Sequence, residues 1–333
     1  MEKKRTRRRR RSWSRTLLLV VFAAAAVYAG VHCVFRAPEQ KEAPLPAPAA
    51  DQETGSAPEE DAQAAALAAH TARKENFYTI LISGVDDGNG NSDTNILAAV
   101  DAENGCFYGV SIPRDTKVFY NGKNHKINAA FGSGGMELLA QVVSDQLGIP
   151  VDYTVLVDLK GFAALVDAIG GVDFQVPIDM DYDDPVQDLS IHFAKGMQHL
   201  NGTQAMKVVR FRHNNDGTGY GSEDIGRMQT QQNFLKAVAK QTLTLSNLDK
   251  VGDFVKIFQK YVETDLTLGN LAWLGEKVIR MGPENIAFST LPNDWRSPYI
   301  YLDPDETLAL VNQHLNPYVE DRVAADLNLL AKP

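Results

Sequence analysis

Cysteine is almost absent from this sequence. The chain has 333 residues and two cysteines, Cys33 and Cys106, of which the first lies inside an apolar run. This pair supports neither a disulfide framework nor a CxxC metal site. The seven histidines show no HExxH spacing, which argues against a zinc hydrolase. Hydrophobic residues make up 44% of the chain and charged residues 23%, so most of it can bury an ordinary core.

A cationic segment followed by an apolar run opens the chain. Residues 3–15 contain nine Lys or Arg, and the apolar run at 16–35 has the length of a bilayer span. A basic flank before the first span stays in the cytoplasm. We therefore expect a cytoplasmic basic tail at 1–15, one transmembrane helix at 16–35 and an extracellular remainder, anchored in the cell membrane of a Gram-positive-type envelope. A cleaved signal peptide is the alternative.

Acidic residues dominate the remainder. Beyond residue 35 there are 33 − 9 = 24 Lys and Arg against 42 − 1 = 41 Asp and Glu, a net charge of −17. Such a domain repels polyanions, which excludes nucleic acid as an expected partner. Residues 36–75, rich in Ala, Pro, Glu and Gln, predict a disordered tether that spans roughly 35 Å as a coil. The folded domain is expected at 76–320, with a C-terminal tail at 321–333.

Hydrophobic patterning predicts an α/β fold with a central mixed sheet sandwiched between helices. Continuous or alternating apolar runs predict strands at 77–82, 96–100, 106–112, 151–158, 172–176 and 285–290. Helical spacing predicts helices at 136–147, 162–169, 203–209, 225–242, 248–261, 268–281 and 305–315. Residues 179–190 are expected to form an acidic loop, and 210–212 an extended segment.

A cationic site is expected where the strand at 106–112 ends. Pro113 stops this strand and Arg114 follows at the sheet edge, where α/β folds present polar groups to ligands. Lys126 and a glycine turn that opens a helix at Met136 come next. Two cations and a helix start at one edge suit an anion. A surface Arg and Lys beside an ordinary turn is the alternative.

Asp86 and Asp93 bracket a glycine-rich loop between two predicted strands. Two carboxylates at one sheet edge suit Mg²⁺, which binds through one or two carboxylates and completes its shell with phosphate oxygens. An acidic turn is the alternative.

Two further groups carry cations. Arg210 and Arg212 are two residues apart, so in an extended segment both guanidinium groups face one side and form a fork for phosphate. A solvated basic strand is the alternative. Arg227 and Gln231 are four apart and share a helix face. Asp224 precedes them as a natural N-cap.

These residues occur in segments that resemble the LytR–CpsA–Psr family of membrane-anchored phosphotransferases. The likeness covers about Phe77 to Tyr318, and no single segment is specific by itself. The matching segments are Ile82–Asp86, Ser92–Thr94, Ser111–Thr116, Lys126–Ala130, Leu147–Tyr153, Gly170–Val172, His199–Gly202, Val209–Arg212 and Asp224–Arg227. Their common order along the chain makes the resemblance specific.

The resemblance implies transfer of a phosphate-linked glycopolymer from a polyprenyl pyrophosphate carrier to a muramic acid hydroxyl of peptidoglycan. It implies that Asp86 and Asp93 hold Mg²⁺ on the pyrophosphate, and that the prenyl tail lies in an apolar cleft. Its implied clamp for the pyrophosphate is Arg114, Lys126, Arg210, Arg212, Arg227 and Gln231. Catalysis is assigned to Arg114, with Asp115 or Asp224 taking the acceptor proton. Either aspartate can instead cap a helix or pair with an arginine.

Three cations usual in the family are missing here. Gly88, Asn91 and Thr230 stand at positions where the family carries arginine. The alternative function is therefore a non-catalytic binder of polyprenyl pyrophosphate, or an envelope-assembly scaffold, with a weakened site. The older assignment of the family to transcriptional regulation conflicts with the predicted span and the net charge of −17.

Overall fold

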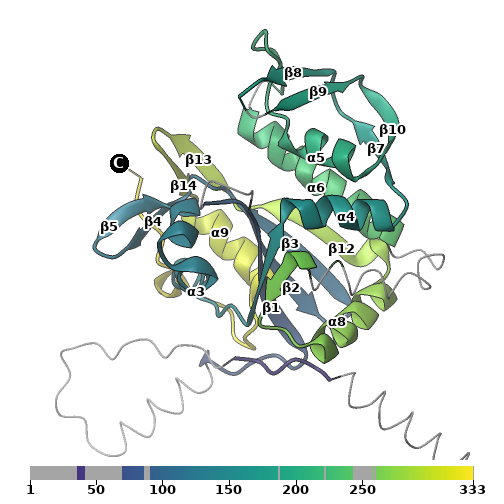
Figure 1. Ribbon diagram of the computed structural model, residues 1–333. Coiled ribbons are helices and arrows are strands. Elements are labelled where there is room, and N and C mark those ends of the chain that lie inside the picture. Colours follow the sequence, from purple (N-terminus) through teal and green to yellow (C-terminus); the bar gives the residue numbers. More distant parts are fainter. Residues whose placement is uncertain are drawn as a thin grey trace, which may run out of the picture.

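The computed structural model describes residues 36–41, 70–85, 91–186, 188–220, 223–242, 257 and 260–332. Its centre is a six-stranded sheet in the order β11–β6–β1–β2–β3–β12 (Figure 1). These strands are β1 (Phe77–Val85), β2 (Ser92–Asp101), β3 (Cys106–Ile112), β6 (Tyr153–Asp158), β11 (Val262–Thr264) and β12 (Ile286–Thr290). The pairs β1–β6 and β3–β12 are parallel and the others antiparallel, so the predicted mixed sheet is confirmed.

The two faces of the sheet are covered by different helices. Successive side chains of a strand point to opposite faces. Phe77 and Leu81 therefore join the core beneath α3 (Asn128–Leu147) and α9 (Pro304–Leu310), whereas Tyr78 and Ile80 pack with α8 (Leu268–Met281). Figure 1 shows α3 and α9 on one side of the strands and α8 on the other. The predicted arrangement of helices on both faces is confirmed.

Helix α3 begins earlier than the sequence predicts. The expected start was Met136, after a glycine turn, but the helix runs from Asn128. Gly134 and Gly135 interrupt it with a kink, where Gly135 has φ = 67°. Because this backbone conformation strongly favours glycine, the glycine pair bends the helix rather than starting it.

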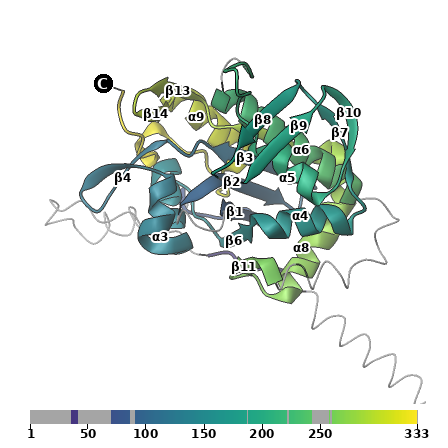
Figure 2. The same cartoon turned by 45° about the horizontal axis from the view of Figure 1, so that its top comes forward.

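A second group of elements packs at one side of the sheet (Figure 2). It consists of the helices α4 (Leu159–Ala168), α5 (Gly202–Arg210) and α6 (Glu223–Thr242) and the strands β7 (Val172–Val176), β8 (Met180–Asp184), β9 (Leu189–Phe193) and β10 (Gly196–Leu200). These elements share a core that includes Phe174, Ile191, Phe211 and Phe234.

The predicted acidic loop at 179–190 is wrong. Residues in this range contribute to the antiparallel hairpin β8–β9. Met180 and Tyr182 alternate with Asp181 and Asp183, so that the apolar members face the core and the acidic ones face solvent. This alternation is a strand pattern that the many acidic residues obscure.

The C-terminal part of the chain follows the prediction closely. The expected helix at 268–281 is α8, and the helix expected at 305–315 is α9 continued by a π-helical turn at Val311–Leu315. Two small hairpins complete the fold: β4 (Lys117–Tyr120) with β5 (Lys123–Lys126), and β13 (Asn293–Arg296) with β14 (Tyr299–Leu302). Most of the helix predicted at 248–261 lies outside the described residues.

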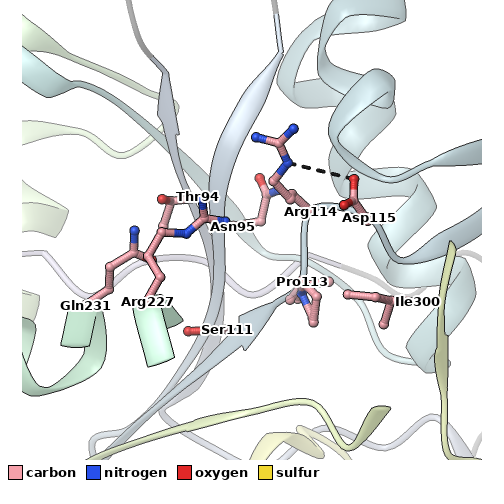
Figure 3. Close-up of a pocket in the computed structure, with 10 residues that line it drawn as sticks. Thr94, Asn95, Ser111, Pro113, Arg114, Asp115, Arg227, Gln231 and Ile300 are labelled. Carbon is pink, nitrogen blue, oxygen red and sulfur yellow. Dashed lines mark ion pairs between the residues drawn. The ribbon is translucent and has the colours of Figure 1, made fainter. Parts of the chain in front are cut away.

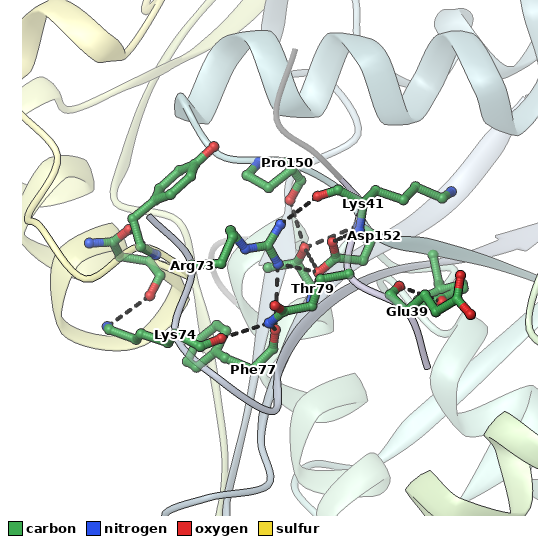
Figure 4. Close-up of polar contacts among 12 residues, drawn as sticks. Glu39, Lys41, Arg73, Lys74, Phe77, Thr79, Pro150 and Asp152 are labelled. Atoms are coloured by element: carbon green, nitrogen blue, oxygen red, sulfur yellow. Dashed lines mark hydrogen bonds and ion pairs between the residues drawn. The ribbon is translucent and has the colours of Figure 1, made fainter. Parts of the chain in front are cut away.

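Two N-terminal segments, 36–41 and 70–75, form what we call the N-terminal strap. Gln40 donates from Nε2 to the carbonyl oxygens of Lys74 (2.7 Å) and Phe77 (2.8 Å). The carboxylate of Asp152 accepts from Lys41 N (3.1 Å) and Arg73 Nη2 (2.8 Å) (Figure 4). Both segments lie within the predicted tether. At these two ends the structure differs from the predicted disorder, because backbone carbonyl groups and the carboxylate of Asp152 bind the segments.

The predictions for the two ends of the chain fall only partly within the described residues. Residues 42–69 of the tether and the predicted span at 16–35 lie outside the described part. Across the described ranges, no helix combines the length and the apolar character that crossing a bilayer requires. At the other end, Arg322 is buried and its backbone N–H donates to Asn312 (2.7 Å), so the first part of the predicted C-terminal tail is attached to the domain.

Candidate functional site

A cavity of about 630 Å³ lies where the sheet meets the second group of elements. The carboxyl ends of β1 and β6 and the start of β2 border it, and α4, α5 and α6 form its other walls. Ligands of α/β sheets commonly bind at this edge. The strand ends contribute Ile82, Ser83, Gly84, Asn91, Thr94, Ile96 and Val157 to its lining.

Four guanidinium groups converge on this cavity. Arg114 follows β3, Arg210 ends α5, Arg212 lies two residues later, and Arg227 belongs to α6. Gln231, one turn beyond Arg227, lines it as well. The sequence therefore placed these five residues in one site, although they come from separate elements. Because arginine keeps its charge, they form a cationic patch in an acidic domain.

Arg210 and Arg212 reach the cavity by a different route from the one predicted. An Asn201–Gln204 capping box starts α5, which extends as far as Arg210. Phe211 ends the helix with φ = −59° and ψ = 136°, and its buried ring packs edge-on against Tyr220. The buried phenyl ring fixes the turn between the two arginines. The prediction of an extended segment at Arg210 is thus wrong, whereas both side chains do line one cavity.

Arg227 is held by close packing around the start of α6. The Arg227 residue is 8% exposed. A Cβ at Gly226 would lie 2.2 Å from Tyr220 Cβ, so only glycine allows Tyr220 to pack here. Burial raises the pKa of Tyr220, while the hydrogen bond with Thr230 and the charge of Arg227 act in the opposite direction. Gln231 donates from Nε2 to Val209 O (3.0 Å), which ties α6 to α5.

Three charged side chains lie close together at the turn after β3. Thr116 donates from N (3.0 Å) and from Oγ1 (2.7 Å) to Pro113 O, which closes the turn. Asp115 Oδ1 lies 3.7 Å from Arg114 Nε (Figure 3). It lies 3.1 Å from Lys126 Nζ. Lys126 does not line the cavity, so in the structure it compensates Asp115 rather than extending the arginine cluster.

The structure describes only part of the aspartates that were predicted for the site. Asp86 lies outside the described residues, and of Asp93 and Asp224 only the backbones are described, in β2 and α6. Gly84 pairs with Thr94 and Val85 with Ser92, so Asp93 is the bulged position between them at the start of β2, in the chain between the cavity-lining Asn91 and Thr94. Over the ranges with described side chains, no three His, Cys, Asp or Glu gather into a metal-binding group.

The positions that lack arginine differ in their surroundings. Thr230 is buried, with its hydroxyl 2.9 Å from Gly226 O and 3.0 Å from the Tyr220 hydroxyl. Asn91 lines the cavity, and Gly88 lies outside the described residues. An arginine at 230 would have to displace Tyr220, so local packing occupies this position in place of the expected cation.

The far wall of the cavity is apolar. Leu159 and Phe162 of α4, Leu189 of the β8–β9 hairpin and Phe234 and Leu235 of α6 contribute to it. The sequence prediction missed Tyr182 and Leu189 because it treated their segment as a loop. Their alternation with Asp181 and Ser190 was the signal that could have identified them.

The fold and this cavity define an α/β domain whose cavity is lined by arginines and by apolar side chains, a combination suited to an amphipathic phosphate ester. The LytR_cpsA_psr family model matches residues 47–316, and the chain belongs to this family. One relative, the polyisoprenyl-teichoic acid–peptidoglycan teichoic acid transferase TagU of Bacillus cereus, is 38% identical over 199 residues. That alignment covers 58% of this chain and 62% of the relative.

Two further comparisons agree with this assignment. The transferase TagV of Bacillus subtilis is 34% identical over 205 residues, which cover 59% of this chain and 51% of the relative. The crystal structure of B. subtilis TagV superposes with a TM-score of 0.62 at 29% identity, over 74% of this chain and all of that chain. The chain thus aligns with about half to three fifths of the length of these curated relatives.

Proposed function

We propose that this protein transfers a phosphate-linked glycopolymer from a polyprenyl pyrophosphate carrier to peptidoglycan. The supporting observation is a single cavity lined both by four arginines and by apolar side chains of α4, the β8–β9 hairpin and α6. The guanidinium groups match the pyrophosphate oxygens in charge and geometry. The apolar wall matches a prenyl chain, whose burial is favourable. The names of the relatives TagU and TagV agree with this substrate class.

The reaction balances without a covalent enzyme intermediate. A sugar hydroxyl of peptidoglycan, for which we propose muramic acid, attacks the phosphorus that carries the glycopolymer. The new P–O bond forms as the bond to the bridging oxygen breaks, and polyprenyl phosphate leaves. Asp115 or Asp224 takes the hydroxyl proton. Because such transition states are loose and highly charged, positioning and charge neutralisation by the arginines supply most of the catalysis.

Magnesium is proposed as the cofactor, held by Asp86 and Asp93. The pairing of Val85 with Ser92 brings the ends of the two strands that carry these positions together beside the arginine cluster. Hard carboxylate oxygens are the donors that Mg²⁺ prefers. Bound there, the ion would neutralise charge on the leaving phosphate.

Replacing Asp93 with Asn is expected to raise the Mg²⁺ concentration needed for half-maximal transfer by about tenfold or more, because one anionic ligand is lost. Asp101→Asn, at the opposite end of β2, is the control and should leave the Mg²⁺ dependence unchanged. A magnesium titration of transfer measures both. Equal Mg²⁺ responses in wild type and the Asp93 variant would remove Asp93 from the metal site.

We also propose that the chain is anchored in the cell membrane by residues 16–35, with its domain on the outer side. The lipid carrier and peptidoglycan are both reached there. Reporter fusions at the C-terminus test this topology, and a cytoplasmic C-terminus would contradict it.

The function is tested by incubating the full chain in detergent with a polyprenyl pyrophosphate-linked glycan, Mg²⁺ and peptidoglycan. The expected products are glycan covalently linked to peptidoglycan and polyprenyl phosphate in equal amounts. The buried Thr230 at an expected arginine position favours a second candidate, a binder without turnover. A binder would retain the carrier and form neither product.

A further inference from the structure

A second cavity, of about 30 Å³, adjoins the first. Both are lined by Thr94, Arg114, Arg227 and Gln231, so the small cavity continues the cationic end of the large one. Its other walls are Asn95 of β2, residues 111–113 at the end of β3, Asp115, and Ile300 of β14. Figure 3 shows Arg227 and Gln231 on one side of Pro113, with Ile300 on the opposite side.

Two buried polar atoms of this small cavity lack a hydrogen bond within the described structure. Asn95 is 1% exposed, and its Oδ1 accepts from Ser83 Oγ (2.8 Å) while its Nδ2 donates to no described group. Asp115 Oδ1 accepts no hydrogen bond either, although Lys126 Nζ lies 3.1 Å away as an ion pair. Buried donors are normally satisfied, so the unpaired Asn95 Nδ2, in one small cavity with the Asp115 carboxylate, marks a binding position.

The chemistry of this pair selects its occupant. A hydroxyl group both accepts and donates hydrogen bonds, so it matches the chemistry of the Asn95 Nδ2 donor and the Asp115 carboxylate, which line the same cavity. The volume of about 30 Å³ exceeds the ~10–15 Å³ that a water-sized group requires.

We infer that this cavity is the subsite for the acceptor hydroxyl of the peptidoglycan glycan strand, an inference that rests on the proposed function. In an in-line displacement the attacking and leaving oxygens lie on opposite sides of the phosphorus. The apolar wall places the prenyl phosphate on the side of α4 and α6. The acceptor must then approach from the opposite side, where Asp115 and Ile300 border the small cavity.

An exposed tryptophan extends this approach outward. Trp295 of β13 pairs directly with Ile300 of β14, so the two side chains share one face of the hairpin with Cβ atoms ~5 Å apart. Trp295 is 54% exposed, whereas Ile300 is 5% exposed. The negative face of an indole ring attracts the C–H groups of a sugar ring. Trp295 is thus placed to stack on a sugar next to the one that reacts, and we call its exposed indole ring the platform.

The platform and the small cavity are held together by the backbone. Ile300 N donates to Asp115 O (2.9 Å), and Thr116 forms a parallel bridge with Ile300. The hairpin that carries Trp295 is therefore bonded directly to the turn that carries Asp115. A glycan stacked on Trp295 would have its hydroxyl positioned relative to the phosphate site by these bonds.

Replacing Asn95 with Ala should raise the KM for soluble peptidoglycan glycan about tenfold, because one hydrogen bond to the acceptor is lost. Donor binding, measured without peptidoglycan, should stay within twofold of wild type. Asn124→Ala, an exposed asparagine of β5, is the control. An unchanged acceptor KM would overturn the assignment of Asn95, and a tenfold loss of donor binding would assign it to the donor instead.

Trp295→Ala tests the platform without disturbing a buried group. It should raise the acceptor KM by about fivefold to tenfold, consistent with loss of one aromatic contact, with donor affinity unchanged. Phe119→Ala is the matched control: Phe119 is 55% exposed and belongs to the neighbouring hairpin β4–β5. Equal effects in the two variants, or an effect on donor affinity alone, would contradict the platform.

A binding measurement separates this inference from the proposed function. The wild-type chain is titrated with a disaccharide from peptidoglycan in the absence of donor, and the Trp295 indole and Asn95 amide signals are followed by NMR. Both should shift together. Shifts without any transfer activity would support the subsite and refute the enzyme, whereas transfer activity without shifts would refute the subsite alone.

Discussion

Replacing Arg114 with alanine is expected to lower the rate of glycopolymer transfer by on the order of 10²–10³-fold, the cost of removing one positioned cationic donor from a charged transition state. Arg114 lines both cavities, as Arg227 does, and it directly precedes Asp115. In the proposed reaction it therefore lies where the transferred phosphate meets the acceptor. Its side chain is 30% exposed, so the substitution should leave the fold intact.

Initial rates of transfer at saturating donor measure this effect, with circular dichroism to verify folding. Arg280→Ala is the control, because Arg280 is an exposed arginine of α8 that pairs with Glu276 and lines neither cavity. A rate for the Arg114 variant within threefold of wild type would count decisively against the proposed site.

Replacing Asp152 with alanine is expected to reduce the free energy of unfolding by ~3–5 kcal/mol, because a buried ion pair loses one partner. Asp152 is fully buried, and its Oδ2 accepts from Thr79 N (2.9 Å) and Arg73 Nη2 (2.8 Å). Without it, the Arg73 guanidinium, whose side chain is 12% exposed, has no counter-charge at this position. The strap would then lose its central attachment.

Thermal unfolding of the full chain measures this change, which corresponds to a Tm lower by roughly 10 °C. Lys41→Ala is the control: it removes an ion pair of 2.7 Å with Asp265 in which both side chains are over a third exposed. Such pairs contribute ~0–1 kcal/mol. Comparable Tm decreases in the two variants would show that Asp152 does not hold the strap.

Local periodicity accounts for the elements that sequence reasoning predicted well. The strands at 77–82 and 106–112 and the helices at 225–242 and 268–281 appear as β1, β3, α6 and α8. In each, the hydrophobic spacing agrees with the burial that the tertiary structure imposes. Where the composition was misleading, as in the acidic β8–β9 hairpin, the alternation of Met180 and Tyr182 with aspartates carried the correct information.

Other features depend on contacts between distant residues. The break between Arg210 and Arg212 is set by burial of Phe211 against Tyr220, which no local pattern encodes. Attachment of the strap depends on Asp152, which follows Lys41 by 111 residues. The small cavity lined by Asn95 and Asp115 exists only because β2 and β3 are neighbours in the sheet.

The order of short cationic and acidic motifs along the chain was sufficient to identify the family and to name the arginines of the cavity. Motifs of this kind are local, so the sequence alone determines them. The tertiary structure alone decided that Lys126 compensates Asp115, that Tyr182 and Leu189 line the cavity, and that Trp295 lies beside Ile300 of the small cavity. These relations depend on pairing and burial between separate elements, whose geometry is set when the core packs.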